Sequence, residues 1–387
     1  MSISKPMKQL QLKVRSFFVK HKKGLISCGF FLAFTTLFII LYTVSRYFPK
    51  FVYKYYTTGL FKIVTFVPKL ITKYLPFVFS ELLLVVFLLV IFFFTGRTIY
   101  KVIIAVKKKF PDKSTFVLHY FAVIFKIVCV LISLFILLGA FNYNSMPVAD
   151  IMGYEITKTD TKVLTELCNY LKEKTADSYI EDKQINRDVI LDEVTEAYDT
   201  ASQKYTFLKK HIGFTNPPKA ASMSTAMCYL QISGIYPYLV PESIVNGRTP
   251  VTSLPHTACH EIAHQLGFAR EDEANYIAYL VCINSDMPIF VYSGYYEAFS
   301  YAMNTLYRYD YEAWFEIYKT IPEGIIEDMK NENEFWNSFK TPNDFVSNIS
   351  SAVNDAYLNA NNVPDGIHSY GRMVDLLIAD YIKNNQP

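Results

Sequence analysis

The chain has 387 residues, of which 51% are hydrophobic, 16% aromatic and 19% charged. Such a composition excludes a disordered or collagen-like chain and supplies enough apolar side chains for a large core. The net charge of +3 conceals two unlike parts. Up to Met146 there are 20 Lys and Arg residues and two acidic residues, whereas from Pro147 onward there are 18 and 33. The acidic second part argues against a nucleic acid partner, and we expect a domain boundary between residues 146 and 147.

Three apolar segments in residues 1–146 predict a membrane module. Residues 24–44 form a run of 21 residues without a charged side chain, which as a helix is long enough to cross a hydrocarbon core about 30 Å thick. The other two predicted transmembrane helices cover about residues 74–96 and 116–140. The alternative is a set of buried core helices in a soluble protein. It is disfavoured because apolar runs of this length are rare in soluble domains.

Basic residues predict the orientation of these spans. Residues 1–24 contain seven Lys and Arg, and residues 97–113 contain six. With three spans both segments lie on one side of the bilayer, and the positive-inside rule makes that side cytoplasmic. We therefore expect a cytoplasmic N-terminus and an extracytoplasmic domain over residues 147–387. The loop 46–73 also contains six Lys and Arg, which counts against this orientation unless the loop forms a helix among the lipid headgroups.

Helical periodicity dominates residues 147–387. Apolar residues recur at helical spacing over residues 163–171 and 190–205. Further helices are expected over about 256–266, 271–285, 294–308, 310–319, 322–338, 342–360 and 369–384. Residues 211–255 are rich in Pro and Gly, with extended candidates at 227–232 and 242–246. The sequence therefore predicts a mainly α protein in which three transmembrane helices precede a helix-rich α+β domain with a small sheet.

Four cysteines lie in the second part of the chain: Cys168, Cys228, Cys259 and Cys282. They are widely spaced and form no CxxC pair, so they do not indicate a disulfide framework. We expect buried free thiols, and the sequence leaves open a single disulfide among the four.

The clearest chemical signal is the motif His260-Glu261-Ile262-Ala263-His264. Positions i and i+4 of a helix share one face, so the two imidazoles can bind the same Zn²⁺ ion. Glu261 is turned by about 100° from His260, which puts its carboxylate beside the metal, where it can take a proton from water. Gly267 is a natural end for this helix. We expect His260 and His264 to be zinc ligands and Glu261 to be the catalytic base.

A catalytic zinc site needs a third protein ligand and an open position. The next predicted helix carries Glu271, Asp272 and Glu273, and it can return antiparallel to the first. We expect Glu273 to be the ligand, because it lies one turn before Ile277 on the inward face. The alternative for Glu273 is a solvated acid in the first turn of the helix. Asn275 or Asp272 is expected to orient a histidine.

These residues also carry a resemblance. HEIAH followed by EDEANYIAYLVCINSDMP is similar to the zinc site of ImmA/IrrE-type metallopeptidases and of the wider gluzincins, which are zincins. The resemblance implies His260, His264 and Glu273 as ligands of one Zn²⁺ ion and Glu261 as the base. Over nearly the whole chain, the three spans, PHTACHEIAHQLGFAREDEANY and a late SYGRMVDLL resemble a bacterial membrane-protein family called domain of unknown function 3810. That likeness implies a multi-pass protein of the bacterial cell membrane and names no substrate.

The expected activity is that of a membrane-anchored zinc metallopeptidase, which hydrolyses a peptide or protein substrate through a metal-activated water. Candidates for the group that stabilises the transition state are Tyr276, His368, Tyr370 and Arg372. Residues 232–246 are a candidate edge strand for binding substrate backbone. The alternative is a non-catalytic membrane receptor or envelope-assembly protein with a structural metal site. The sequence leaves open the substrate, the oligomeric state and whether the site is active or latent.

Overall fold

The structure is a computed structural model that describes residues 5–107, 113–156, 161–340 and 373–385. The chain divides into two compact units. The first comprises Met1–Ser45 and Val85–Leu137, and the second comprises Arg46–Leu84 and Leu138–Pro387. The second unit therefore includes residues 46–84 in addition to the domain expected from Pro147 onward.

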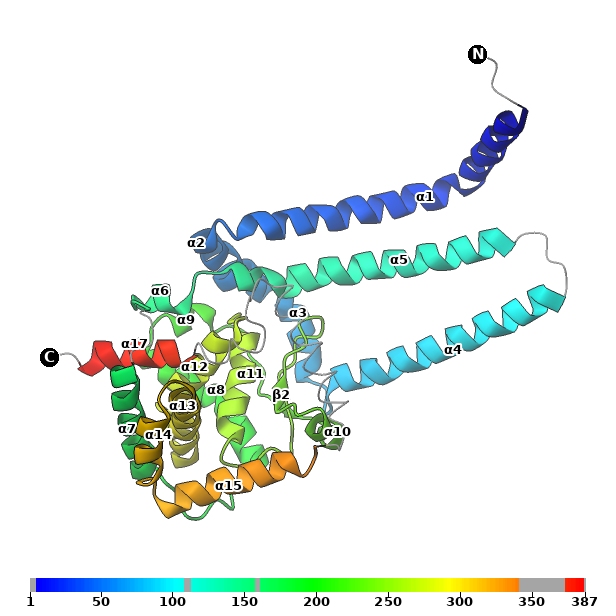
Figure 1. Ribbon diagram of the computed structural model, residues 1–387. Helices are drawn as coiled ribbons and strands as arrows, with labels where there is room; N and C mark the ends of the chain where they lie inside the picture. The colour runs from blue at the N-terminus through cyan, green and yellow to red at the C-terminus, as the bar shows by residue number, and fades with distance from the viewer. Residues whose placement is uncertain (1–4, 108–112, 157–160, 341–372, 386–387) are drawn as a thin grey trace. The chain divides into compact units, whose positions relative to one another are not determined.

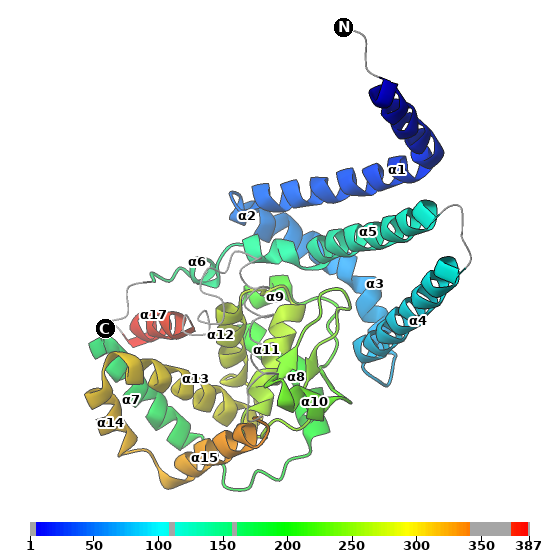
Figure 2. The ribbon, with the colours of Figure 1, turned by 45° about the vertical axis from the view of Figure 1, so that its right-hand side comes forward.

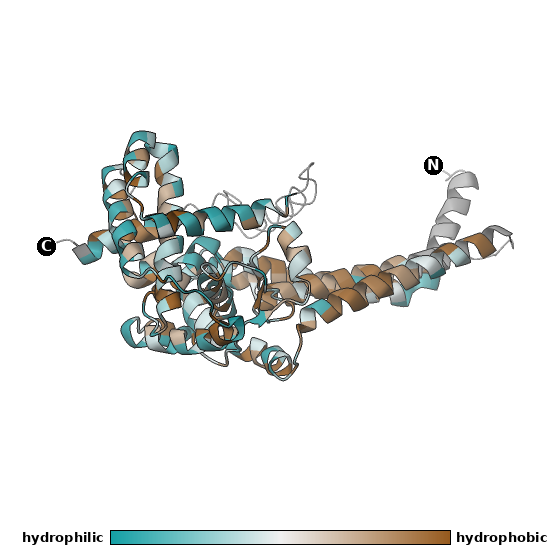
Figure 3. Cartoon of the chain, turned by 90° about the horizontal axis from the view of Figure 1, so that it is seen from below, coloured by the Kyte–Doolittle hydropathy of each residue, from teal (hydrophilic) through white to brown (hydrophobic). Residues whose placement is uncertain are grey.

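Among the described residues, three helices are long and apolar enough to cross a membrane. They are α1 (Lys5–Ser45), α4 (Phe79–Lys107) and α5 (Lys113–Leu138), and their apolar windows are Val19–Ser45, Phe79–Tyr100 and Tyr120–Leu138. In Figure 3 the brown colour of hydrophobic residues runs along much of the coloured length of these helices. The second window begins five residues later than the expected span 74–96, because α3 (Phe61–Lys73) ends first and Pro76 separates the two helices.

The segment before α4 forms a series of short helices in the second unit. It contains α2 (Pro49–Phe51), the π-helix η1 (Val52–Leu60) and α3. Val52, Tyr56 and Phe61 are buried and form a small apolar cluster. Phe141, which follows α5 and belongs to the same unit, packs against this cluster, so residues 46–84 contact the later part of the chain.

The rest of the second unit is mainly helical, as predicted. Its early helices are η2 (Ala140–Asn144), α6 (Val148–Met152), α7 (Thr161–Asp177), α8 (Arg187–Lys204), α9 (Leu208–His211) and α10 (Ser224–Tyr229). Its later helices are α11 (Leu254–Gln265), α12 (Glu271–Cys282), α13 (Pro288–Tyr309), α14 (Tyr311–Tyr318), α15 (Glu323–Asn337) and α17 (Met373–Asn385). The expected helix at 342–360 lies outside the described residues.

A small sheet accompanies these helices. Its strands are β1 (Lys219–Ala220), β2 (Gly234–Ile235) and β3 (Ile244–Val245), in the order β1-β3-β2. β3 pairs parallel with β1 and antiparallel with β2, so β2 is an edge strand. The expectation of an extended segment at 242–246 agrees with β3. The expectation at 227–232 was wrong, because its first residues belong to α10.

The core of the second unit surrounds α11. Helices α8, α12 and α13 pack against it, and Figure 2 shows it near the middle of this unit. The side chains at the centre include Ile262, Ala263 and Ile277, all fully buried. All six cysteines are free, and the Cys259 and Cys282 thiols lie 3.7 Å apart between α11 and α12. Because α8, α12 and α13 all pack against α11, the motif helix is held from several sides.

Candidate metal centre

Residues that favour a helix start and a helix stop lie at the two ends of the motif helix α11. Pro255 lies in its first turn, where a missing N–H costs nothing. At the other end Gly267 adopts φ +96°, and the Phe268 N–H donates to the Ala263 carbonyl. Such a left-handed glycine closes a helix by satisfying its last carbonyl groups. His260 and His264 therefore lie in the last turns of α11, with their ring centroids 4.6 Å apart.

A short connection returns the chain from Gly267 to α12, which begins at Glu271. The Glu271 carboxylate lies against both histidines. Its Oε2 is 3.1 Å from His260 Nε2 and its Oε1 is 3.5 Å from His264 Nε2. The three potential ligand atoms all lie within 4.8 Å of one another. The side chains of His260 and Glu271 each retain 13% exposure, so this cluster reaches solvent.

Glu273 lies elsewhere, which corrects the expectation that it would converge on the two histidines. Its Oε1 accepts from Arg270 Nη2 at 2.7 Å and from the Val148 N–H at 2.9 Å. Glu273 is buried, as expected for an inward-facing residue. That inward face, however, meets the start of α6 instead of α11. In this structure Glu273 ties α12 to α6.

The position of Asn275 explains why Glu271 and not Glu273 meets the histidines. Residues four apart share a helix face, whereas residues two apart point about 200° away from each other. Asn275 Oδ1 lies 2.8 Å from His260 Nδ1, so Glu271, one turn earlier, faces the same histidine. Asn275 was expected to orient a histidine, and the structure places it to do so. Combining that expectation with helical geometry would have selected Glu271 from the sequence.

Hydrogen bonds at Nδ1 determine what the two histidines offer at Nε2. The partner of His260 Nδ1 is the Asn275 amide oxygen, and the partner of His264 Nδ1 is the Phe268 carbonyl at 2.8 Å. Both partners accept, so each Nδ1 carries a proton and each neutral ring presents a lone pair at Nε2. Two lone pairs and a carboxylate facing one another require a cation or a proton between them. The donor set of two imidazole nitrogens and one carboxylate oxygen fits Zn²⁺.

The pKa values at the cluster reflect the same arrangement. Burial lowers the pKa of His264, but the charge and hydrogen bond of Glu271 outweigh burial and raise this pKa to about 9. Burial raises the pKa of Glu271, and the two histidines more than reverse that effect and hold it well below its usual range. The raised pKa of His264 means that without a metal a proton on this imidazole pairs with the Glu271 carboxylate. A divalent cation would replace that proton.

Glu261 is buried and closely packed beside the cluster. Its Oε2 is buried and makes no hydrogen bond among the described residues. Burial raises its pKa to about 7, against the lowering effect of the histidine charges. The backbone of β2 covers it, and a Cβ atom added at Gly234 would lie 2.8 Å from Glu261 Cγ and Cδ. A larger residue at position 234 would displace the Glu261 side chain, so Gly234 is a site residue that the sequence analysis missed.

Of the other predicted site residues, Tyr276 lies among the described residues and is bonded away from the cluster. The hydroxyl of Tyr276 lies 3.0 Å from that of Tyr154, which donates to Asp380 at 2.6 Å. Tyr276 therefore belongs to a tyrosine network on the far side of α12. His368, Tyr370 and Arg372 lie outside the described residues, and their role as transition-state stabilisers stays a prediction.

Comparisons with known proteins give a family and no precedent for the site. The family model described as "Protein of unknown function (DUF3810)" matches residues 56–378. This range covers most of the chain and includes both α3 and the histidine cluster, so the chain belongs to this family. No curated protein and no solved structure matches the chain.

Proposed function

We propose that this protein is a membrane-anchored zinc-dependent metallopeptidase. One observation carries the proposal: His260, His264 and Glu271 converge to within 4.8 Å, and the Glu261 carboxylate lies beside them with an unpaired buried oxygen. A structural metal site needs only the ligands. The additional carboxylate, held close by Gly234, is what a hydrolase needs.

The proposed hydrolysis assigns a separate role to each group of site residues. His260, His264 and Glu271 would hold one Zn²⁺ ion. When bound, the ion would lower the pKa of a water molecule and polarise a substrate carbonyl. Glu261 Oε2 would accept a proton from that water and deliver it to the leaving amine. Asn275 and the Phe268 carbonyl keep the imidazoles in the tautomer that binds metal.

The edge strand β2 supports a peptide as the substrate. Its pairing with β3 leaves its other edge without a strand partner in the described sheet. An extended peptide can bind to such an edge through backbone hydrogen bonds. Because Gly234 of β2 lies directly against Glu261, a peptide bound there would bring its scissile bond close to the catalytic carboxylate.

We further propose that the catalytic domain is extracytoplasmic and the N-terminus cytoplasmic, in the bacterial cell membrane. The basic segments 1–24 and 97–113 support this orientation. The positive charges of residues 46–73, which counted against it, are discussed with the surface of α3 below.

A non-catalytic membrane receptor or envelope-assembly protein with a structural metal site is the alternative. Zinc content and cleavage of a peptide library separate the two, measured on the purified full-length chain and on Glu261→Gln. If the protein is a peptidase, both chains should contain zinc. The wild type should cleave the library, and the cleavage rate of Glu261→Gln should be at least about 100-fold lower. Zinc in both chains with cleavage by neither would favour the receptor.

A further inference from the structure

Residues 46–78 connect two helices that can cross a membrane. Val19–Ser45 precedes them and Phe79–Tyr100 follows them. If both helices cross, this connection begins and ends at the same bilayer face. Its helices α2, η1 and α3 belong nevertheless to the compact unit that contains the metal centre (Figure 1).

Helix α3 has its apolar side outward. Leu60, Ile63, Val67 and Ile71 recur at helical spacing on one face and are 44%, 71%, 58% and 52% exposed. The opposite face carries Thr65, Lys69 and Thr72, which are buried against the domain. A surface helix in water shows the reverse distribution, with its apolar stripe inward and its polar face outward. The outward face of α3 is therefore built for an apolar environment.

The ends of this connection carry exposed aromatic and basic side chains. The exposed aromatic residues are Tyr47, Phe48, Phe51 and Tyr55 before α3, and Tyr74 and Phe77 after it. Lys50 and Lys54 are exposed among the first group and Lys73 lies beside the second. Aromatic rings and lysines in this mixture are typical of the boundary between headgroups and acyl chains. This composition and the tethering at both ends favour a lipid surface over a protein partner.

We propose that the outward face of residues 47–77 lies in the lipid headgroup region. Given the proposed function, this segment is then the membrane-contacting surface of the catalytic domain. The exposed lysines of the loop, Lys50, Lys54 and Lys73, then contact headgroups, whereas Lys69 is buried on the inward face. They no longer count against a cytoplasmic N-terminus, since interfacial lysines need not mark the cytoplasmic side.

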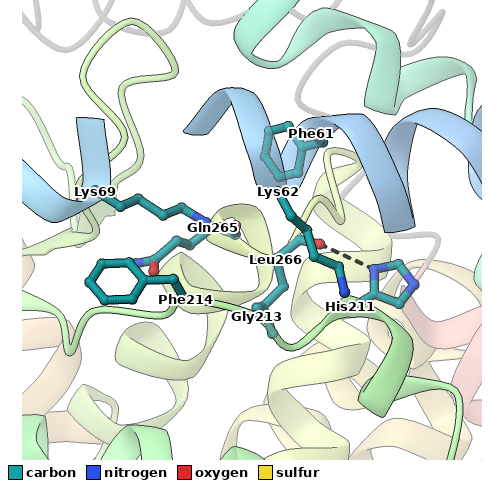
Figure 4. Close-up of a pocket in the computed structure, with 8 residues that line it drawn as sticks. All are labelled: Phe61, Lys62, Lys69, His211, Gly213, Phe214, Gln265 and Leu266. Carbon is teal, nitrogen blue, oxygen red and sulfur yellow. Dashed lines mark hydrogen bonds between the residues drawn. The ribbon is translucent and has the colours of Figure 1, made fainter. Parts of the chain in front are cut away.

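The inward face of α3 holds the end of the motif helix. Gln265 is the last residue of α11, and its carbonyl accepts from Lys69 Nζ at 2.8 Å. Figure 4 shows the Lys69 side chain extending to Gln265. Nearby, His211 is buried, with Nδ1 3.1 Å from the Leu266 carbonyl. A cavity of only about 10 Å³ separates these groups. Helix α3, whose outward face is proposed to contact the membrane, is thus hydrogen-bonded to α11, the helix that carries His260 and His264.

The domain also clamps the connection from α3 to α4. Lys219 of β1 donates to the carbonyls of Thr72, Leu75 and Phe77. Glu242 accepts from the backbone and hydroxyl of Ser80 at the start of α4 and pairs with Lys219 at 2.8 Å. These contacts fix the rotation of α3, so that its apolar stripe stays outward.

Tryptophan quenching in vesicles tests the proposal on the full-length chain. In a background with Trp314→Phe and Trp336→Phe, single tryptophans are introduced as Ile63→Trp or Val67→Trp. The matched control is Tyr309→Trp at the end of α13, where the native side chain is 65% exposed. Vesicles contain phosphatidylcholine with or without bromine on the acyl chains, and iodide serves as the aqueous quencher.

We expect brominated lipid to reduce the emission at positions 63 and 67 at least twofold, with little iodide quenching, and the reverse at position 309. Iodide quenching at 63 and 67 equal to that at 309 would overturn the proposal. Protection from both quenchers would also overturn it, because a protein partner or second copy would then cover the face. Circular dichroism of each variant establishes that it is folded.

Discussion

At the scale of single residues, the site depends on Gly234 as much as on its charged groups. We predict that Gly234→Ala lowers the turnover number about 100-fold, since a displacement of about 1 Å at a catalytic group has that effect. The added methyl would overlap the Glu261 side chain. Zinc content should not change, because the atoms nearest to the added methyl belong to Glu261, which is not one of the three proposed ligands.

Gly247→Ala is the control for this substitution. It lies just after β3, and its added Cβ would be 3.3 Å from the nearest side-chain atoms, so cleavage should stay close to that of the wild type. Equal cleavage by Gly234→Ala and the wild type would contradict the assignment of Glu261 as the base.

Lys69 gives a prediction about pH. Burial, helped by the charge of Lys62, lowers the pKa of Lys69 to about 7, whereas in the unfolded chain it is about 10.4. Between these values the unfolded state binds more protons, so stability rises with pH by up to about 1.4 kcal/mol per unit. His211 faces the same region and stays neutral, because burial lowers its pKa to about 4.

We predict that Lys69→Met removes this pH dependence. The measurement is the melting temperature of the full-length chain in detergent at about pH 7 and pH 9. The wild type should melt higher at the upper pH, and the difference should shrink in Lys69→Met. An equal rise in both chains would show that the Lys69 amine is not the titrating group.

At the scale of elements, helix positions were predictable, and the choice of the third candidate ligand needed more than motif spacing. The HExxH helix, its glycine stop and the following helix could be read from periodicity and capping residues. Choosing between Glu271 and Glu273 depends on the rotation of α12 about its axis, which turns Glu273 toward Arg270 and the start of α6. Only Asn275 carried that information in the sequence, through its position one turn after Glu271.

The strands show a different limit. β1, β2 and β3 have two residues each, which is too short for an alternating pattern of polar and apolar residues. The close approach of β2 to Glu261 depends on the absence of a side chain at Gly234. A lone glycine in a loop-rich stretch carries no signal of such a contact.

At the scale of the whole molecule, residues 46–84 belong to the same compact unit as the candidate metal centre. We predict that a chain beginning at Pro147 does not fold. It would leave the buried Gln265 carbonyl and the buried Asn216 amide without the partners that Lys69 and Thr72 supply. Each buried polar group left unpaired costs about 1–3 kcal/mol, against a typical total stability of about 5–15 kcal/mol. Cooperative melting, followed by near-ultraviolet circular dichroism in detergent, tests this prediction.

The control for that truncation retains residues 46–84 and 138–387 and replaces 85–137 with a Gly/Ser linker of about 30 residues. It should melt cooperatively in detergent. If the chain from Pro147 melted as cooperatively as this control, residues 46–84 would be an accessory and not part of the domain.

The claim on which the rest depends is that two histidines and Glu271 form one metal site, and zinc content measures it most directly. The full-length wild type, Glu271→Gln and Glu273→Gln are loaded with zinc, dialysed against a weak chelator and analysed for bound metal. We predict about one ion per chain in the wild type and in Glu273→Gln, and little or none in Glu271→Gln. Glu273→Gln should melt lower, because the buried Arg270 guanidinium loses the negative charge that pairs with it. Zinc lost from Glu273→Gln but retained by Glu271→Gln, or absent from the wild type, would contradict the account.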